Sequence, residues 1–281
     1  RGELKEGDTV VEASSGSTSI ALALACAQMG LRFVAFIPTT ATHERGLMIR
    51  AYGGEVRRVE GGMVKVLEAA HEAALSHRWF AARQFENPDN AEAHRMFTGP
   101  EILAQMECGC VDAVVSGVGT GGTLLGLWQA FDDAGCEARA YAAIPCEGGA
   151  FRDNAECSSL AFSKEVPGVA DCLSALYRDW QTGPRGGAIE ELSIDEDLCL
   201  GLTRKLWALG FPVGPSSGLN YAAALDEVTA TVRRAAEGAG KARQVADVAQ
   251  DEAQRSGEVV TQATAAMSAT MPPAAGTGAV G

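Results

Sequence analysis

Segments typical of β-strands alternate with segments typical of helices along most of this chain, with turn residues between them. Several strand-like segments, such as "FVAFI" at residues 33–37, are uninterrupted apolar runs. Such runs suit strands that are buried on both faces, as in a parallel sheet covered by helices on each side. The alternation therefore predicts an α/β fold with parallel strands. The predicted strands are residues 9–13, 31–38, 55–61, 79–85, 111–117, 138–145, 189–194 and 210–215, and the predicted helices begin near Thr18, Thr42, Met63, Asn90, Gly122, Asp195 and Ser217.

The charge of the chain limits its partners. Its 23 Lys and Arg residues against 36 Asp and Glu residues give a formal net charge of −13. Neither nucleic acid nor a membrane is therefore an expected partner, and any bound anion must be held locally by backbone N–H groups and hydroxyls. No apolar run approaches the roughly 20 residues that span a bilayer, and the N-terminal "RGELKEGD" is not a signal peptide, so we expect a cytoplasmic protein. After about Glu237 the composition shifts to Ala, Gly, Gln and charged residues, and residues 236–281 are predicted to form a mobile tail.

The eight cysteines are scattered without a paired framework, and the only close pair is Cys108 and Cys110. No second pair or histidine stands at metal-ligand spacing, so we expect reduced thiols and no metal site. The four histidines show no catalytic or ligand spacing and are interpreted as surface or structural residues: His43, His71, His77 and His94.

Two strand-to-helix junctions carry the chemical signal. At the first, "ASSGSTS" (residues 13–19) places five hydroxyl side chains and Gly16 where the N–H groups of a helix begin. Such a turn can seat an anion, although ordinary helix N-capping is the simpler interpretation of this stretch alone. At the second, "SGVGTGGT" (residues 116–123) interleaves glycines with Thr120 and Thr123, which suits a phosphate.

Gly117, Gly119 and Gly122 also fit the G-x-G-x-x-G spacing of dinucleotide-binding folds. That interpretation needs an acidic residue after the next strand to bind a ribose, and Glu147 is a late candidate. A Rossmann-type NAD(P)-binding enzyme is therefore an alternative. Two anion seats together favour a ligand with a phosphate at one end and a carboxylate-bearing partner at the other.

Five blocks in this order resemble the family of cysteine synthase (O-acetylserine sulfhydrylase) and its cystathionine β-synthase relatives, which are fold-type II pyridoxal-phosphate (PLP) enzymes. The blocks are "VVEASSGSTSIALALACAQMG", "QFENPDNAEAHRMFTGPEIL", "VVSGVGTGGTLLG", "VPGVADCLSAL" and "FPVGPSSGLNYAAAL". The resemblance implies the tryptophan synthase β-like fold, with two doubly wound α/β lobes at residues 1–83 and 84–235 and the cofactor between them.

The resemblance also implies roles for individual residues. The cofactor phosphate would lie on the loop Gly119, Thr120, Gly121, Gly122 and Thr123, and Ser216 would meet the pyridine nitrogen. The substrate carboxylate would be bound by Ser14, Ser15, Gly16, Thr18 and Gln84, and Gly168 would lie on a segment that faces the substrate. Ser17 stands where these enzymes usually carry an asparagine that bonds the cofactor ring oxygen, which implies altered cofactor electronics or a shifted substrate preference. Without the resemblance, Ser216 could simply cap the last helix, and Gln84 could be a turn residue.

The implied reaction is β-replacement on serine or an O-activated serine with a thiol or sulfide donor, as in cysteine biosynthesis, by a homodimer. In the family the Schiff-base lysine precedes the stretch that matches residues 1–17. None of Lys5, Lys65, Lys164, Lys205 and Lys241 lies in a matching context. Because the chain starts at Arg1, we interpret it as N-terminally truncated and expect this form to be inactive. A non-catalytic module that keeps the two lobes for binding alone is a further alternative.

Overall fold

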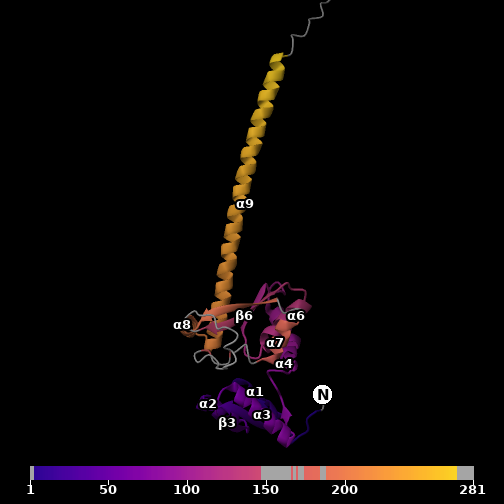
Figure 1. Cartoon of the computed structure of the whole chain (residues 1–281), viewed down its shortest axis with the longest axis vertical. Coiled ribbons are helices and arrows are strands. Elements are labelled where there is room, and N and C mark those ends of the chain that lie inside the picture. Colours follow the sequence, from indigo (N-terminus) through magenta and orange to yellow (C-terminus); the bar gives the residue numbers. More distant parts are fainter. Residues whose placement is uncertain (1–2, 147–165, 167–168, 170–173, 184–187, 271–281) are drawn as a thin grey trace, which may run out of the picture. The chain divides into compact units, whose positions relative to one another are not determined.

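The computed structural model describes residues 3–146, 166, 169, 174–183 and 188–270. The chain divides into two compact units, Arg1–Leu225 and Asp226–Gly281. The first unit holds two parallel sheets with helices between their strands (Figure 1). The predicted α/β class is therefore confirmed.

The first sheet has the strand order β3-β2-β1-β4, and all its strands are parallel. Its strands are β1 (Thr9–Ala13), β2 (Arg32–Pro38), β3 (Glu55–Val59) and β4 (Phe80–Ala81), and its helices are α1 (Ser17–Gln28), α2 (His43–Ala51) and α3 (Met63–His77). Val34 and Phe36 pack in one cluster with Val66 of α3, while Phe33 and Ala35 pack in another with Ala23 of α1. Both faces of β2 are thus covered, which explains its uninterrupted apolar run.

The second sheet has the parallel order β5-β6-β7. Its strands are β5 (Ala113–Gly117), β6 (Arg139–Cys146) and β7 (Ile189–Asp195). The accompanying helices are α4 (Asp89–Ala93), the π-helix η1 (His94–Thr98), α5 (Gly99–Gln105), α6 (Gly122–Asp133), α7 (Ala175–Thr182) and α8 (Glu196–Ala208). All strands of each sheet fall inside one predicted lobe, and the boundary between residues 83 and 84 stays a prediction.

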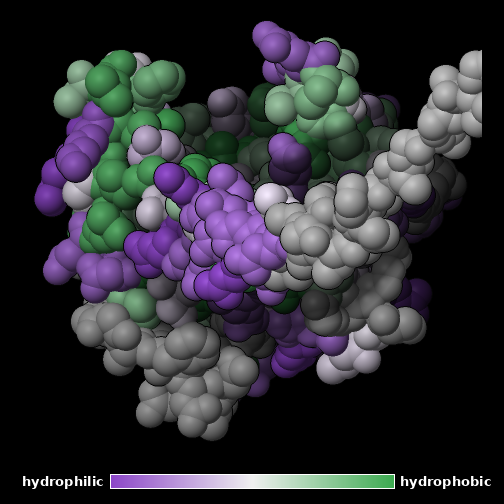
Figure 2. Space-filling model, turned by 90° about the horizontal axis from the view of Figure 1, so that it is seen from above, coloured by the Kyte–Doolittle hydropathy of each residue, from purple (hydrophilic) through white to green (hydrophobic). Residues whose placement is uncertain are grey.

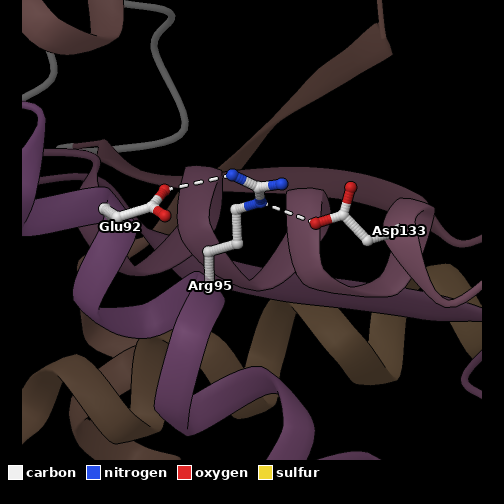
Figure 3. A network of polar contacts seen from close by, with 3 residues as sticks. All are labelled: Glu92, Arg95 and Asp133. Atoms are coloured by element: carbon white, nitrogen blue, oxygen red, sulfur yellow. Dashed lines mark hydrogen bonds and ion pairs between the residues drawn. The ribbon is translucent and has the colours of Figure 1, made fainter.

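An arginine ties η1 to the neighbouring helices. Arg95 donates from Nε to Asp133 Oδ2 at 2.6 Å and from a terminal nitrogen to Glu92 Oε2 at 3.2 Å (Figure 3). Glu92 lies on α4 and Asp133 ends α6, so the bridge links the helix that precedes η1 to the far end of α6. These side chains are 40–52% exposed, and exposed ion pairs add little to the free energy of unfolding. We therefore expect the bridge to align the helices and to contribute little to stability.

The last helix, α9 (Pro215–Thr270), runs without interruption in Figure 1. The segment predicted as a tail is thus helical as far as Thr270, its mobility stays a prediction, and residues 271–281 lie outside the described part. Ala, Glu, Gln, Lys and Arg are strong helix formers, and no proline follows Pro215 before Pro272, so the local preference is helical.

The strand predicted at residues 210–215 is absent from the described chain, which runs there without regular structure between α8 and α9. Pro212 and Pro215 have no N–H to donate to a sheet ladder, and Gly210 turns the chain with φ +90°. The apolar pattern of this segment was misleading because two prolines interrupt it.

Cys110 and Cys136 form a disulfide, so the expectation that all thiols are reduced was wrong. Cys110 precedes β5 and Cys136 follows α6, and their Cα atoms lie 5.7 Å apart. Their 26-residue separation gave no sequence signal, because packing of α6 against β5 is what brings the two together. Cys26 and Cys199 are buried free thiols, and Cys108 is an exposed one.

The face of the molecule seen from above carries both hydrophobic and hydrophilic residues. Figure 2 shows hydrophobic (green) and hydrophilic (purple) residues side by side on the face viewed. Among the described helices, none has an apolar stretch long enough to cross a membrane. Within the same described residues, no three His, Cys, Asp or Glu side chains are grouped as ligands of a metal ion.

Candidate active site

A cavity of about 390 Å³ brings the two predicted anion seats together. Its predicted members are Ser14, Ser15, Ser17, Thr18, Gln84, Gly119, Thr120, Thr123 and Ser216. Ser116 and Gly117 of the predicted glycine turn also line it, and residues that sequence reasoning did not propose complete the lining: Arg45, Phe85, Val169 and Asn220. Gly16, Gly121 and Gly122 belong to the same two loops but do not line the cavity, and Gly168 lies outside the described residues.

One wall is the hydroxyl loop, residues 14–18, between β1 and α1. Ser14 is buried, and its Oγ accepts a hydrogen bond from Gly16 N at 2.9 Å. No side chain caps the first turn of α1, whose N-cap is Gly16. Ordinary N-capping therefore does not explain the hydroxyls of this loop.

Position 16 requires a glycine because of its backbone conformation and because Arg45 lies close to it. Its φ is +143°, and a Cβ built on it would collide with Cδ of Arg45. Arg45 in turn donates to Ser15 O at 2.8 Å and so holds the loop from the side of α2. Among the described residues that line this cavity, Arg45 is also the one charged side chain.

Gln84 lies beside the hydroxyl loop and is fixed at both ends of its amide. Its Nε2 donates to Ala13 O at 2.7 Å, and its Oε1 accepts from Thr18 Oγ1 at 2.7 Å. The Gln84 side chain also hydrogen-bonds the carboxylate of Glu12, which lies behind the loop. The hydroxyl hydrogen of Thr18 is used by Gln84.

The opposite wall is the glycine loop, residues 117–123, between β5 and α6. Gly121 has φ +79°, and α6 begins at Gly122. A Cβ on Gly121 would lie 3.0 Å from Cβ of Tyr177, and one on Gly122 would collide with the side chain of Asn90. The backbone must pass closely here, and its N–H groups at the positive end of α6 form an anion seat.

Three side chains that the sequence did not single out hold the glycine loop in place. Asn90 donates from Nδ2 to Thr120 Oγ1 and to Gln84 O, both at 2.9 Å, and so connects the two walls. Ser174 donates to Thr120 O at 2.6 Å, and Asn220 accepts from Gly117 N at 2.7 Å. The predicted helix start near Asn90 is confirmed by α4, which begins at Asp89, but only tertiary packing shows what Asn90 contacts.

The electrostatics of the lining favour an anion. No carboxylate lines the described part of the cavity, although the chain as a whole is acidic. His94 contacts Thr123 Oγ1 through Nε2 at 3.2 Å, and burial lowers the pKa of His94, which favours the neutral imidazole. A phosphate in this cavity would meet N–H and O–H donors and no carboxylate among the described lining residues.

Glu12 on β1 lies behind the hydroxyl loop and is 2% exposed. Burial raises the pKa of Glu12 to about 7, although hydrogen bonds from Gln84 and Ala13 lower it in part. Its folded-state pKa thus lies above the value of 4.5 for an unperturbed glutamate. A group of this kind favours the folded state below pH 4.5 and loses that contribution as the pH rises to 7.

We therefore expect Glu12 to lower the free energy of unfolding by up to about 3 kcal/mol as the pH rises from 4.5 to 7. Urea unfolding across this range should show a flatter pH profile in Glu12→Gln than in the unmodified chain. Glu68→Gln, which removes an exposed carboxylate on α3, should keep the original slope. Equal slopes in Glu12→Gln and the unmodified chain would contradict the expectation.

No lysine lines the cavity among the described residues. Lys65 pairs with Glu68 at 2.7 Å on the surface of α3, Lys205 lies on α8 and Lys241 on α9. Lys5 lies in the N-terminal turn, and Lys164 is outside the described residues.

Known proteins are similar to this chain in sequence and in architecture. A cysteine synthase of Staphylococcus aureus (strain Mu50 / ATCC 700699) is 44% identical over 128 residues, which is 45% of this chain and 41% of that protein. An O-ureido-L-serine synthase of Streptomyces lavendulae is 44% identical over 147 residues, 52% of this chain and 45% of that protein. The chain thus spans about half the length, or less, of these curated relatives.

Solved structures of related enzymes are also similar to this chain. A crystal structure of O-ureido-L-serine synthase superposes with a TM-score of 0.68 at 36% identity and covers 80% of this chain and 69% of that one. The O-acetylserine-dependent cystathionine β-synthase of Helicobacter pylori gives a TM-score of 0.68 at 25% identity, with 81% and 72% covered. Residues 1–264 match the family model described as "Pyridoxal-phosphate dependent enzyme". With this match over most of its length, the chain belongs to the pyridoxal-phosphate-dependent enzyme family.

Proposed function

We propose that the cavity binds PLP beside an amino acid and serves β-replacement on serine or an O-activated serine, with a thiol or sulfide as the incoming group. The observation that carries the proposal is the pairing of two anion seats, the hydroxyl loop and the glycine loop, in one cavity with no carboxylate among its described lining residues. A bound PLP would supply an electron sink that lets the amino acid lose its α-proton and β-substituent.

The glycine loop would hold the cofactor phosphate. Its N–H groups at the start of α6 and the hydroxyls of Thr120 and Thr123 are donors, and Asn90 and Ser174 keep Thr120 in place. Ser216, in the first turn of α9, would meet the pyridine nitrogen. A neutral hydroxyl there withdraws fewer electrons from the ring than a charged partner would, which suits β-elimination.

The hydroxyl loop and Gln84 would orient the substrate carboxylate. Ser14, Ser15 and the loop backbone offer donors, and Gln84 lines the cavity beside them. Thr18 acts through Gln84, because its hydroxyl already donates to the Gln84 amide. Gly168 is proposed for the segment that faces the substrate.

Relatives of equal identity carry different names, cysteine synthase and O-ureido-L-serine synthase, so identity alone does not choose the incoming group. The sulfur donor and the cysteine-biosynthetic role rest on the resemblance of the five sequence blocks. A cytoplasmic homodimer is part of the same proposal, and light scattering after gel filtration would test the dimer.

A comparison of three ligands tests cofactor binding. We expect PLP to quench tryptophan fluorescence, and pyridoxal, which lacks the phosphate, to bind about a hundredfold more weakly, because two or more charge-assisted hydrogen bonds are lost. NADH should not compete. Equal affinities for PLP and pyridoxal, or binding of NADH in place of PLP, would contradict the proposal and favour the dinucleotide alternative.

Ser17→Asn tests the position at which this chain departs from its relatives' usual residue. Ser17 lines the cavity, and the longer amide adds a donor that reaches further toward the cofactor ring. We expect the affinity for PLP to rise about threefold to tenfold, the value of roughly one net hydrogen bond. Ser76→Asn, on an exposed position of α3, is the matched control. Unchanged PLP affinity and absorbance in Ser17→Asn would count against contact between this position and the cofactor.

A further inference from the structure

Glu12 lies where two paired strands separate. β1 and β4 pair through Val10 and Val11, and Ala82 N still donates to Val11 O at 3.1 Å. Beyond that point the chain turns away through Arg83, whose φ is +52°. The next N–H groups on the two sides, those of Ala13 and Gln84, therefore need another acceptor.

The carboxylate of Glu12 supplies that acceptor on both sides. Its Oε1 accepts from Ala13 N at 2.8 Å, and its Oε2 accepts from Gln84 N at 3.1 Å. Ala13 leads directly into the hydroxyl loop, and Gln84 is the other arm of the same anion seat. One buried side chain thus sets the spacing between the two arms.

We propose that Glu12 is the positioning residue of the substrate-carboxylate seat, and that uptake of a proton by Glu12 loosens the seat. The proposal deepens the function proposed above and rests on it. Glu12 does not line the cavity and acts through the backbone of its two partners.

The chemistry of the carboxyl group explains the coupling. An ionised carboxylate has two acceptor oxygens, and here each accepts one N–H. A proton on either oxygen turns that oxygen into a hydroxyl, which is a weaker acceptor than an ionised carboxylate, so the hydrogen bond from its N–H weakens. Weakening one of the two hydrogen bonds that hold Ala13 and Gln84 together favours a shift of the backbone.

The surroundings place this change near neutral pH. Burial raises the pKa of Glu12 to about 7, and the negative charge of Glu86 adds a smaller rise. A second cavity, of about 360 Å³, lies against Glu12. The other ionisable side chains that line it are Glu68 and His71 of α3, Arg83 and Glu86 of the segment after β4, and Arg178 of α7.

The hydrogen bonds continue beyond the seat. Gln84 O accepts from Asn90, whose Nδ2 also donates to Thr120 of the glycine loop. A shift of the Gln84 backbone would therefore move Asn90 and its hydrogen bond to Thr120. Protonation of Glu12 would in this way affect both walls of the cavity.

NMR titration of the unmodified chain tests the coupling directly and needs no cofactor. We expect the Glu12 side-chain carboxyl carbon to titrate with a midpoint near 7, and the amide signals of Ala13 and Gln84 to shift with the same midpoint. In Glu86→Gln the shared midpoint should move to lower pH while both amides still respond. Amides that stay unchanged while Glu12 titrates, or a Glu12 midpoint below 5.5, would overturn the proposal.

Acetate probes the seat, because its own charge is constant between pH 6 and 8. Its affinity, followed by the amide signals of residues 14–18, should fall about threefold to tenfold from pH 8 to pH 6, as one charge-assisted hydrogen bond is lost. Glu12→Gln should bind acetate weakly at both pH values, and Glu68→Gln should keep the pH dependence. Equal acetate affinity at pH 6 and pH 8 in the unmodified chain would contradict the loosening.

The two proposals can fail separately. If acetate binds at neither pH while Ala13 and Gln84 still follow Glu12, the positioning role stands and the carboxylate-binding function fails. If acetate binds and the two amides do not follow Glu12, the function stands and the positioning role fails.

Discussion

Gly121→Asp is expected to abolish PLP binding and to leave the fold largely intact. Gly121 stands in the glycine loop with φ +79°, directly before α6. A side chain there enters strained backbone and lies 3.0 Å from Cβ of Tyr177, so the loop must move. Its carboxylate also brings negative charge to the seat of a phosphate. We expect the affinity to fall about a hundredfold or more, as several charge-assisted hydrogen bonds are lost.

The matched control is Gly109→Asp. Gly109 has a similar φ of +66°, and a Cβ built on it meets nothing within 4 Å. The same strain and charge are thus added away from the cavity, and PLP binding should be unchanged. Fluorescence titration with PLP gives the affinity, and far-ultraviolet circular dichroism and a thermal melt report the fold. Normal PLP affinity in a folded Gly121→Asp protein would overturn the assignment of the phosphate seat.

A polypeptide of these 281 residues alone is expected to bind PLP without turning over substrate. The reaction needs a lysine that takes up the cofactor covalently and moves the α-proton, and such lysines have their pKa lowered by burial. No described lysine lines the cavity, and the side chain of Lys65 is 64% exposed beside Glu68.

Borohydride reduction with PLP, followed by peptide mass mapping, tests this expectation. We expect weak labelling spread over several lysines, and no cysteine from O-acetylserine and sulfide. Lys65→Arg should leave PLP affinity unchanged, because Lys65 lies on the surface of α3. Labelling concentrated on one of the five lysines, together with cysteine formation, would show that this lysine is catalytic.

The order of the strands and helices could be predicted because the residue pattern that favours each of them lies within the element itself. The apolar run of β2 correctly indicated a strand buried on both faces, and the starts of α1, α3 and α6 were predicted within one residue. The strand predicted at residues 210–215 was wrong because the hydrophobic pattern resembled a strand, whereas two prolines lack the N–H groups that sheet hydrogen bonds require. The helix from 236 to 270 was missed because an Ala-, Gly- and Gln-rich composition was interpreted as disorder, although most of its residues favour a helix.

The loops of the site were visible in the sequence because glycines and hydroxyls at strand-to-helix junctions have a local meaning. The hydroxyl loop and the glycine loop each follow a strand and precede a helix, and their residues line one cavity. The supporting residues gave no comparable signal. Asn90, Ser174 and Asn220 are ordinary polar residues whose partners lie 30, 54 and 103 positions away.

The sequence by itself thus determined the parallel α/β architecture, the two anion seats and the family to which they point, because backbone preference and turn chemistry act over a few neighbouring residues. Only the tertiary structure decided that Asn90 joins the two walls, that Cys110 meets Cys136, and that Glu12 lies buried between Ala13 and Gln84. These arrangements depend on contacts between residues far apart along the chain, such as Glu12 with Gln84 and Asn90 with Thr120. The altered pKa of Glu12 arises from burial, which exists only once the sheets and helices have packed.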